Sequence, residues 1–178
     1  MTGVVDLQAY RIKAVEQRGF RAWHKRFGET YGAKTKLADL SDSTLYILAL
    51  PGEKTAVAFY ELILGILGLG EALKFYYLPT TDQMMVVDIH FFLADQVRFE
   101  LMRRLGWLTS FPGEKYTLIE MVQRFKEMKA ENKTTPPKLS KAQPDFDVYD
   151  ALTNGDKDAF VRRKLQKALE DFRIRLAT

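Results

Sequence analysis

The sequence predicts an all-α protein, a single-domain helical bundle built around two buried central helices at residues 53–69 and 81–105. Three observations predict this class: apolar residues recur at helical spacing near both ends of the chain, two central segments are apolar on most sides, and capping residues or glycines mark helix ends. The alternative is an α+β domain with a small antiparallel sheet, whose strands would lie near residues 45–50, 73–78 and 84–92.

The first helix is expected to be amphipathic. At 100° per residue, one side carries an apolar stripe, formed by Val5, Ala9, Ile12, Phe20, Trp23 and Phe27. The opposite side is basic and carries Arg11, Arg18, Arg21 and Lys25. Glu16 interrupts the stripe and Gly19 weakens the helix, so a bend or break is expected near them.

The first central helix is predicted from the segment "EKTAVAFYELILGILGLG". This segment is apolar nearly all round, which is typical of a buried helix. Gly65 and Gly68 would allow a neighbouring backbone to approach closely, and Gly70 is the expected terminator.

The second central helix is predicted from "TDQMMVVDIHFFLADQVRFELMRRL". A strand over residues 84–92 is the competing interpretation, because short apolar runs do not separate the two structures. The helix accounts for both ends of the segment, with Thr80 as N-cap, Gln83 completing a capping box and Gly106 as the glycine after the helix.

The remainder of the chain is expected to hold shorter helices and a linker. Thr117 and Glu120 have the spacing of a second capping box. Residues 132–144 contain three prolines and little apolar bulk, which indicates a linker. Asp156 is expected to cap a closing helix whose apolar stripe contains Val161, Leu165, Ala168, Phe172 and Leu176.

These segments predict a division of the chain into three parts. Residues 1–131 would form the helical core, residues 132–144 the Pro-rich linker, and residues 145–178 a C-terminal helical appendage. The spacing of the closing stripe suits packing on the core or on a second subunit.

The composition excludes several classes of site. With no cysteine in 178 residues there is no disulfide, no thiolate nucleophile and no cysteine-ligated metal. The N-terminus does not resemble a signal peptide, and the longest uncharged apolar run, residues 62–70, is far shorter than the ~20 residues of a spanning helix. The sequence therefore predicts a cytoplasmic protein without a membrane span.

Charge is distributed unevenly along the chain, which has a net charge of +4. Residues 1–36 hold eight Lys and Arg against three Asp and Glu, whereas residues 37–110 hold five against nine. A basic front and an acidic middle could attract each other within one fold. The acidic part includes Glu100, which is expected to form helix-surface ion pairs with Arg103 and Arg104.

The candidate site is a pair of acids in the second central helix. Asp88 and Asp95 are seven residues apart, so on a helix they point the same way, about 10 Å apart along the axis. They share that face with apolar side chains, namely Phe91, Phe92, Phe99 and Met102. Acids in apolar surroundings require hydrogen bonds, a cation or a raised pKa, so the pair predicts an internal polar site for a ligand. The structural alternative is that a cation satisfies each acid, with Arg98 as the local candidate for Asp95.

No metal, cofactor or catalytic residue is predicted. His90 would point away from Asp88 on a helix, and the chain has neither a Glu-x-x-His nor a His-x-x-x-His pattern. The phosphate-binding and dinucleotide-binding glycine motifs are also absent. The candidate ligand-binding residues are therefore Asp88, Asp95, Arg98 and His90.

Three classes of function follow. The first is a non-enzymatic interaction or assembly module that contacts a second copy or another protein through the closing amphipathic helix, with the basic first helix as a further candidate surface. The second is a small-ligand binder or enzyme with the internal polar site around Asp88 and Asp95. The third is nucleic-acid or anionic-partner binding through the basic face of the first helix, formed by Arg11, Arg18, Arg21 and Lys25.

Overall fold

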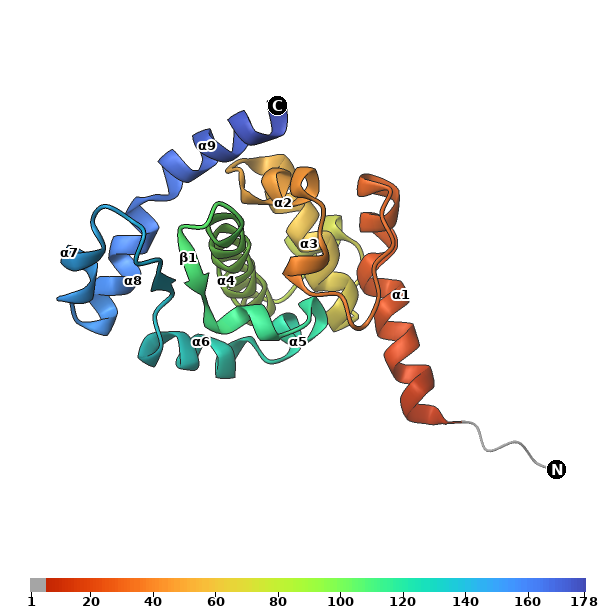
Figure 1. Cartoon of the computed structure of the whole chain (residues 1–178). Helices are drawn as coiled ribbons and strands as arrows, with labels where there is room; N and C mark the ends of the chain where they lie inside the picture. The colour runs from red at the N-terminus through yellow and green to blue at the C-terminus, as the bar shows by residue number, and fades with distance from the viewer. Residues whose placement is uncertain (1–5) are drawn as a thin grey trace.

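The structure of the chain, a computed structural model, describes residues 6–178 and is almost entirely helical (Figure 1). Its helices are α1 (Leu7–Phe27), η1 (Leu37–Asp39), α2 (Asp42–Ala49), α3 (Glu53–Leu67), η2 (Ala72–Tyr77), α4 (Thr80–Arg104), η3 (Pro112–Lys115), α5 (Leu118–Gln123), α6 (Phe125–Thr134), α7 (Phe146–Asp150), α8 (Asn154–Arg163) and α9 (Leu165–Ala177). The all-α prediction is confirmed. The α+β alternative is wrong, because its three proposed strands coincide with α2, η2 and α4.

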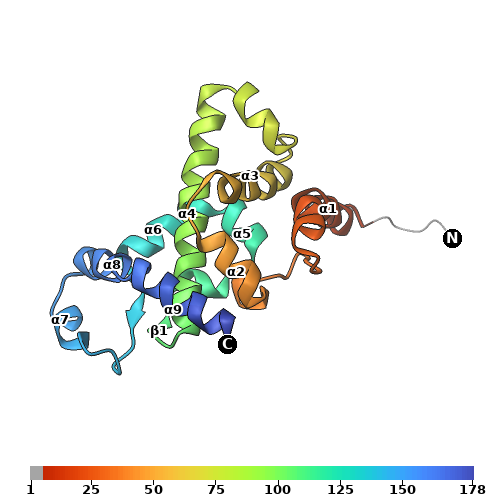
Figure 2. The ribbon, with the colours of Figure 1, turned by 90° about the horizontal axis from the view of Figure 1, so that it is seen from above.

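The two predicted central helices form the middle of the molecule. Figure 2 shows α4 as a long rod, with α3 and η2 beside its first half, α2, α6 and α9 around its second half, and α1 farther out, against α3. Both helices are rich in buried apolar side chains, such as Leu62 and Ile63 of α3 and Ile89 and Leu93 of α4. The helix α3 ends at Gly68, with φ at 70°, so Gly70 is not the terminator that the sequence predicted.

The two ends of α4 differ in how well local sequence predicted them. At its C-terminus, Gly106 has φ at 81° and donates to the Arg103 carbonyl at 2.9 Å, while the Trp107 N–H donates to Met102 at 3.0 Å. These two bonds form a Schellman motif, as Gly106 predicted. The predicted N-terminal capping box is wrong: Pro79 is the N-cap residue, and the Gln83 side chain instead donates to the Phe75 carbonyl at 2.9 Å.

The capping box predicted before α5 is confirmed. Thr117 Oγ1 accepts from the Glu120 N–H at 3.1 Å, and the Glu120 carboxylate accepts from the Thr117 N–H at 3.2 Å. Each side chain satisfies a backbone donor that the first turn of the helix leaves free.

The helix α1 is continuous through Gly19, so the expected bend or break is wrong. Gly19 instead lies against Gly65 of α3, where a Cβ on Gly65 would be 2.4 Å from the Arg18 carbonyl oxygen. The Trp23 indole donates a hydrogen bond to the Ala58 carbonyl at 2.8 Å, one of the few hydrogen bonds between α1 and α3. The predicted role of Gly65 in a close backbone approach is confirmed.

The apolar stripe of α1 is only half covered. Phe20 and Trp23 are fully buried against α3, whereas the first turns of α1 extend away from the body of the molecule (Figure 1). Ile12 of the predicted stripe is 48% exposed, and Val5 lies outside the described residues. Leu7 and Tyr10, on the other side of the helix, are 64% and 68% exposed. An apolar helical surface therefore remains open at this end.

The Pro-rich stretch 132–144 begins as the last turn of α6 and contains a strand. This strand, β2 (Lys138–Leu139), pairs antiparallel with β1 (Leu108–Ser110), with Leu108 opposite Leu139. Leu139 is buried. The closing helix is divided at Lys164 into α8 and α9, and its N-cap is Thr153, not the predicted Asp156.

The C-terminal helices pack on the core of their own chain, where Figures 1 and 2 place α9 beside α2 and α4. Val161, Ala168 and Phe172 of the predicted stripe are fully buried, and the Phe172 ring stacks on Tyr46 at 6.2 Å between centroids. Of the two alternatives for this stripe, packing on the core of its own chain is the one that the structure shows.

Within residues 6–178, no helix combines the length and the apolar character that crossing a membrane requires.

Candidate functional site

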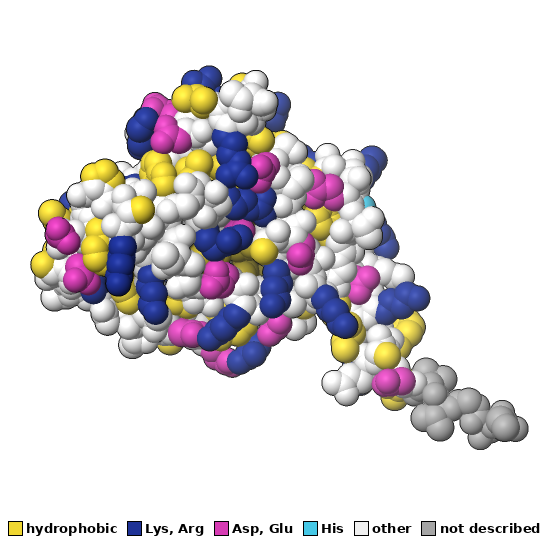
Figure 3. Space-filling view, viewed as in Figure 1, with side chains coloured by type: hydrophobic (Ala, Val, Ile, Leu, Met, Phe, Trp, Pro, Cys, Tyr) yellow, Lys and Arg dark blue, Asp and Glu magenta, His cyan; other side chains and the backbone are white. Residues whose placement is uncertain are grey.

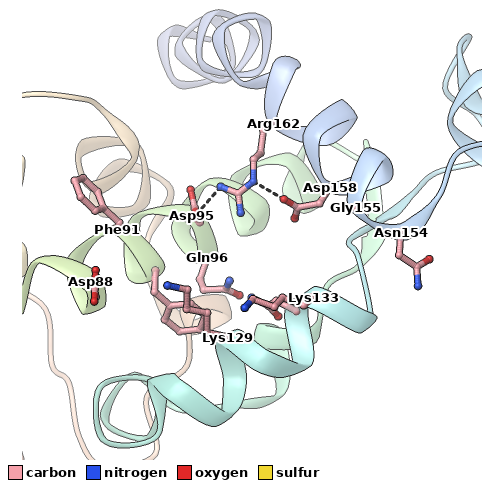
Figure 4. Close-up of a pocket in the computed structure, with 12 residues that line it drawn as sticks. Asp88, Phe91, Asp95, Gln96, Lys129, Lys133, Asn154, Gly155, Asp158 and Arg162 are labelled. Atoms are coloured by element: carbon pink, nitrogen blue, oxygen red, sulfur yellow. Dashed lines mark hydrogen bonds and ion pairs between the residues drawn. The ribbon is translucent and has the colours of Figure 1, made fainter. Parts of the chain in front are cut away.

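Asp88 and Asp95 line a pocket between α4, α6 and α8, with a volume of about 460 Å³. From α4 the pocket also receives Gln96, from α6 it receives Lys129 and Lys133, and from α8 it receives Arg162. Figure 4 shows these side chains converging from the three helices. The structure thus brings the two predicted acids to one site, on the side of α4 that the helical spacing indicated.

The acids are not internal, and this part of the prediction is wrong. Asp88 is exposed, and the side chain of Asp95 is 26% exposed. The reason is that α6 and α8 cover only the second half of this side of α4, as Figure 2 shows. The candidate site is therefore an open pocket at the surface.

The cation that satisfies Asp95 comes from a distant helix. Arg162 Nη1 lies 2.5 Å from Asp95, and Arg162 Nε donates to Asp158 at 2.6 Å. Burial by itself would lower the pKa of Arg162, but the two carboxylates raise it overall. Arg98, the predicted local partner, instead donates to the Ala49 carbonyl at 3.3 Å.

His90 lies outside the pocket. Its ring is half-buried among aromatic side chains, with centroid distances of 5.1 Å to Phe59, 5.3 Å to Tyr60 and 5.4 Å to Phe91. Burial, and then the charge of Arg98, lower the pKa of His90, so the imidazole is neutral at pH 7. The four candidate ligand residues thus separate into the pair Asp88 and Asp95 and two residues engaged elsewhere.

His90 belongs to a continuous row of rings that links η2, α3 and α4. Centroid distances along the row are 5.5 Å from Tyr76 to Phe75, 4.6 Å from Phe75 to Tyr60, 5.3 Å from Tyr60 to His90 and 5.4 Å from His90 to Phe91. Burial and the neighbouring Tyr76 raise the pKa of Tyr60. We call these five residues the aromatic row.

Both ends of the aromatic row belong to an exposed apolar surface. This surface, the η2–α4 surface, is formed by large side chains that are between 61% and 86% exposed: Leu73, Tyr76, Tyr77, Met84 and Phe91. Figure 2 shows η2 and the first half of α4 extending beyond the remaining helices. Large apolar side chains left exposed on neighbouring elements in this way are typical of a protein contact. Sequence analysis missed it because the apolar character of this segment indicated burial.

The basic side chains of α1 are divided between structural and exposed roles. Arg18 Nε donates to the Gly65 carbonyl at 3.2 Å, near the C-terminus of α3. Arg11, Arg21 and Lys25 are exposed and form no ion pair within residues 6–178. Figure 3 shows basic and hydrophobic side chains side by side on the projecting start of this helix.

Glu100 forms the expected ion pairs with Arg103 and Arg104, but it is fully buried, so the prediction that these pairs lie on the helix surface is wrong. Its carboxylate accepts from Arg103 at 2.8 and 2.6 Å and from Arg104 at 3.1 Å. Arg104 also donates to Asp42 of α2 at 2.8 Å, and Arg175 of α9 lies 3.3 Å from the same acid. This network joins α4, α2 and α9.

Gln96 is the second buried polar residue that sequence analysis missed. Its side chain is fully buried, and neither Oε1 nor Nε2 has a hydrogen-bond partner in the described part of the chain. A Cβ on Gly113 of η3 would lie 1.9 Å from Gln96 Oε1, so this glycine makes room for the amide. No pattern in the sequence separates Gln96 from a surface glutamine.

No histidine lines the pocket. The described residues hold no cluster of three His, Asp or Glu side chains that could bind a metal ion. His24, the other histidine, accepts the Tyr31 N–H at 3.1 Å in the α1 region and does not line the pocket. No protein-family model, no curated protein and no solved structure matches the chain.

Proposed function

We propose that the chain is a non-enzymatic assembly protein that binds a second copy of itself through the η2–α4 surface. The observation that carries this proposal is the exposure of five large apolar side chains on one surface, connected by the aromatic row. Burying such side chains is favourable by roughly 25 cal/mol per Å² of apolar area removed from water. The helical fold by itself carries no function.

The complementary surface is the projecting start of α1. Leu7 and Tyr10 are three residues apart, so they lie together on the side of the helix that faces away from α3. Arg11 and Lys13 flank them. This is a basic apolar strip without a partner in its own chain.

Charge favours contact between these two surfaces. Residues 7–18 contain three basic side chains against one acidic, whereas residues 71–91 contain three acidic side chains, Glu71, Asp82 and Asp88, against one lysine. Complementary charge around an apolar contact increases the association rate and sets the orientation of the partners. Because the two surfaces differ, the contact is head-to-tail, and its geometry generates a ring or an open chain of copies.

Sedimentation velocity over a range of protein concentrations tests this proposal. Replacing Leu73 and Tyr77 by lysine should shift the protein to monomer, because cationic side chains would then occupy the apolar contact opposite the basic start of α1. These two side chains point largely into solvent, so the helical circular dichroism should not change.

Val148 of α7 provides the matched control, since it is 60% exposed but lies outside both surfaces. Val148→Lys should assemble like the unmodified chain. The proposal fails if the unmodified chain is monomeric throughout, or if the Leu73→Lys, Tyr77→Lys variant assembles as well as the control.

A further inference from the structure

We propose that the pocket between α4, α6 and α8 binds the phosphate group of a small phosphate monoester. Three kinds of donor converge there from three elements: the ammonium groups of Lys129 and Lys133, the backbone N–H groups at the start of α8, and the side-chain amide of Gln96. The pocket adjoins the η2–α4 surface, because Phe91 belongs to both. Figure 4 shows how the two lysines, Gln96 and the start of α8 are arranged.

The buried amide of Gln96 is the feature that points to a ligand. An unsatisfied polar group in a protein interior costs about 1–3 kcal/mol, so a fully buried, unpaired amide calls for a partner. Figure 4 shows this side chain directed from α4 toward Lys133. Because Oε1 lies against Gly113, Nε2 is the group left to donate. A free hydrogen-bond donor at this position favours an anionic ligand.

The two lysines supply the charge. Lys129 and Lys133 are four residues apart on α6, so their ammonium groups lie on one side of the helix. Other cations near this helix have partners, with Lys115 bonded to Glu131 at 2.8 Å and Arg124 to Glu127 at 2.7 Å. Lys129 and Lys133 have no carboxylate partner in the described chain.

The start of α8 adds backbone donors. Thr153 caps the helix by accepting from the Asp156 N–H, which leaves the N–H groups of Asn154 and Gly155 without an acceptor among the described residues. Asn154 Nδ2 donates to the Thr134 carbonyl at 2.9 Å, and this bond holds the start of α8 beside the end of α6. Gly155 has open space where a Cβ would be, so an anion can approach the backbone.

Three carboxylates line the pocket, those of Asp88, Asp95 and Asp158, but their repulsion of a bound anion is reduced. Arg162 lies between Asp95 and Asp158 and offsets part of their charge. Asp88 is exposed, at the end of the pocket farther from α8 in Figure 4. Phe91 and Phe92 also line the pocket and provide an apolar wall for the organic part of a monoester.

Isothermal titration with inorganic phosphate and with phenyl phosphate tests this inference, at pH 8 so that both probes are dianions and at constant ionic strength in chloride. We expect both to bind, phenyl phosphate more tightly. The double variant Lys129→Ala, Lys133→Ala should weaken the binding of phenyl phosphate at least tenfold. Lys126→Ala removes an exposed lysine of the same helix that does not line the pocket, and it should retain the original affinity.

Gln96→Met separates a ligand-binding amide from a structural one. Methionine has a similar shape without unsatisfied donors or acceptors, so the ligand-free variant should melt roughly 2–4 °C higher than the original chain. The same variant should bind phenyl phosphate at least tenfold more weakly.

Three results would overturn the proposal. The first is the absence of a heat of binding with either probe. The second is an equal affinity for phenyl phosphate in the double-lysine variant and in the Lys126→Ala control. The third is a lower melting temperature of the Gln96→Met variant than of the original chain.

Discussion

Glu100→Ala is expected to lower the free energy of unfolding by about 3 kcal/mol. The substitution removes the only acid within hydrogen-bond distance of both Arg103 and Arg104, as far as residues 6–178 are concerned. Breaking a buried ion pair from one side costs about 3–5 kcal/mol, because the remaining charge stays buried without compensation. Arg104 retains Asp42 and the Leu37 carbonyl, so the lower end of that range is expected.

The matched control for Glu100 is Glu127→Ala. Glu127 pairs with Arg124 at the same i, i+3 spacing at the start of α6, but its side chain is 67% exposed. Exposed pairs contribute less than about 1 kcal/mol. Urea unfolding followed by circular dichroism measures both variants, and equal losses would contradict the buried network.

Gly65→Ala is expected to lower the free energy of unfolding by about 2 kcal/mol. Alanine is favoured over glycine within a helix by roughly 1 kcal/mol. At this position, however, its Cβ would lie 2.4 Å from the Arg18 carbonyl and 3.1 Å from Gly19 Cα. Both contacts are with backbone, so α1 and α3 must separate, and overpacking of this kind costs about 1–3 kcal/mol or more.

The control for this substitution is Gly155→Ala, because a Cβ at Gly155 of α8 meets no atom within 4 Å. It should leave the stability unchanged or raise it slightly. The fluorescence of Trp23, whose indole bonds to Ala58 across the α1–α3 contact, should change in Gly65→Ala and not in the control. A stable Gly65→Ala variant with unchanged fluorescence would show that the helices do not cross this closely.

The sequence predicted that α4 is a helix and where it ends, but not which elements pack against it. Gly106 defined its C-terminus because a glycine in the left-handed conformation is a local signal. The spacing of Asp88 and Asp95 correctly placed them on one side. Which residues of α4 are buried depends on where α6 and α8 pack, so the exposure of Asp88 and the burial of Glu100 were not predictable from this segment.

Long-range pairing explains the other differences. The Pro-rich stretch reads as a linker because its own composition contains no sign of β1, whose residues lie about thirty positions earlier. The stripe of the closing helices correctly predicted a buried side, but Phe172 packs on Tyr46 of the same chain, and local spacing does not specify the partner. Arg162 is the partner of Asp95 for the same reason: the contact joins residues far apart in sequence.

The assembly contact that we propose therefore involves α1 and the η2–α4 surface and not the closing helices. The start of α1 and the η2–α4 surface are apolar, exposed and opposite in charge. The closing stripe, by contrast, has its largest side chain fully buried.

Site-directed disulfide formation between copies tests this central claim most directly, because the chain contains no cysteine of its own. Tyr10→Cys protein is mixed with Tyr77→Cys protein under mild oxidation, and a mixture of Tyr10→Cys with Val148→Cys serves as the control. The account predicts a covalent mixed dimer in the first mixture, formed faster than in the control and more slowly at high salt. Equal rates in the two mixtures would contradict docking of α1 on the η2–α4 surface.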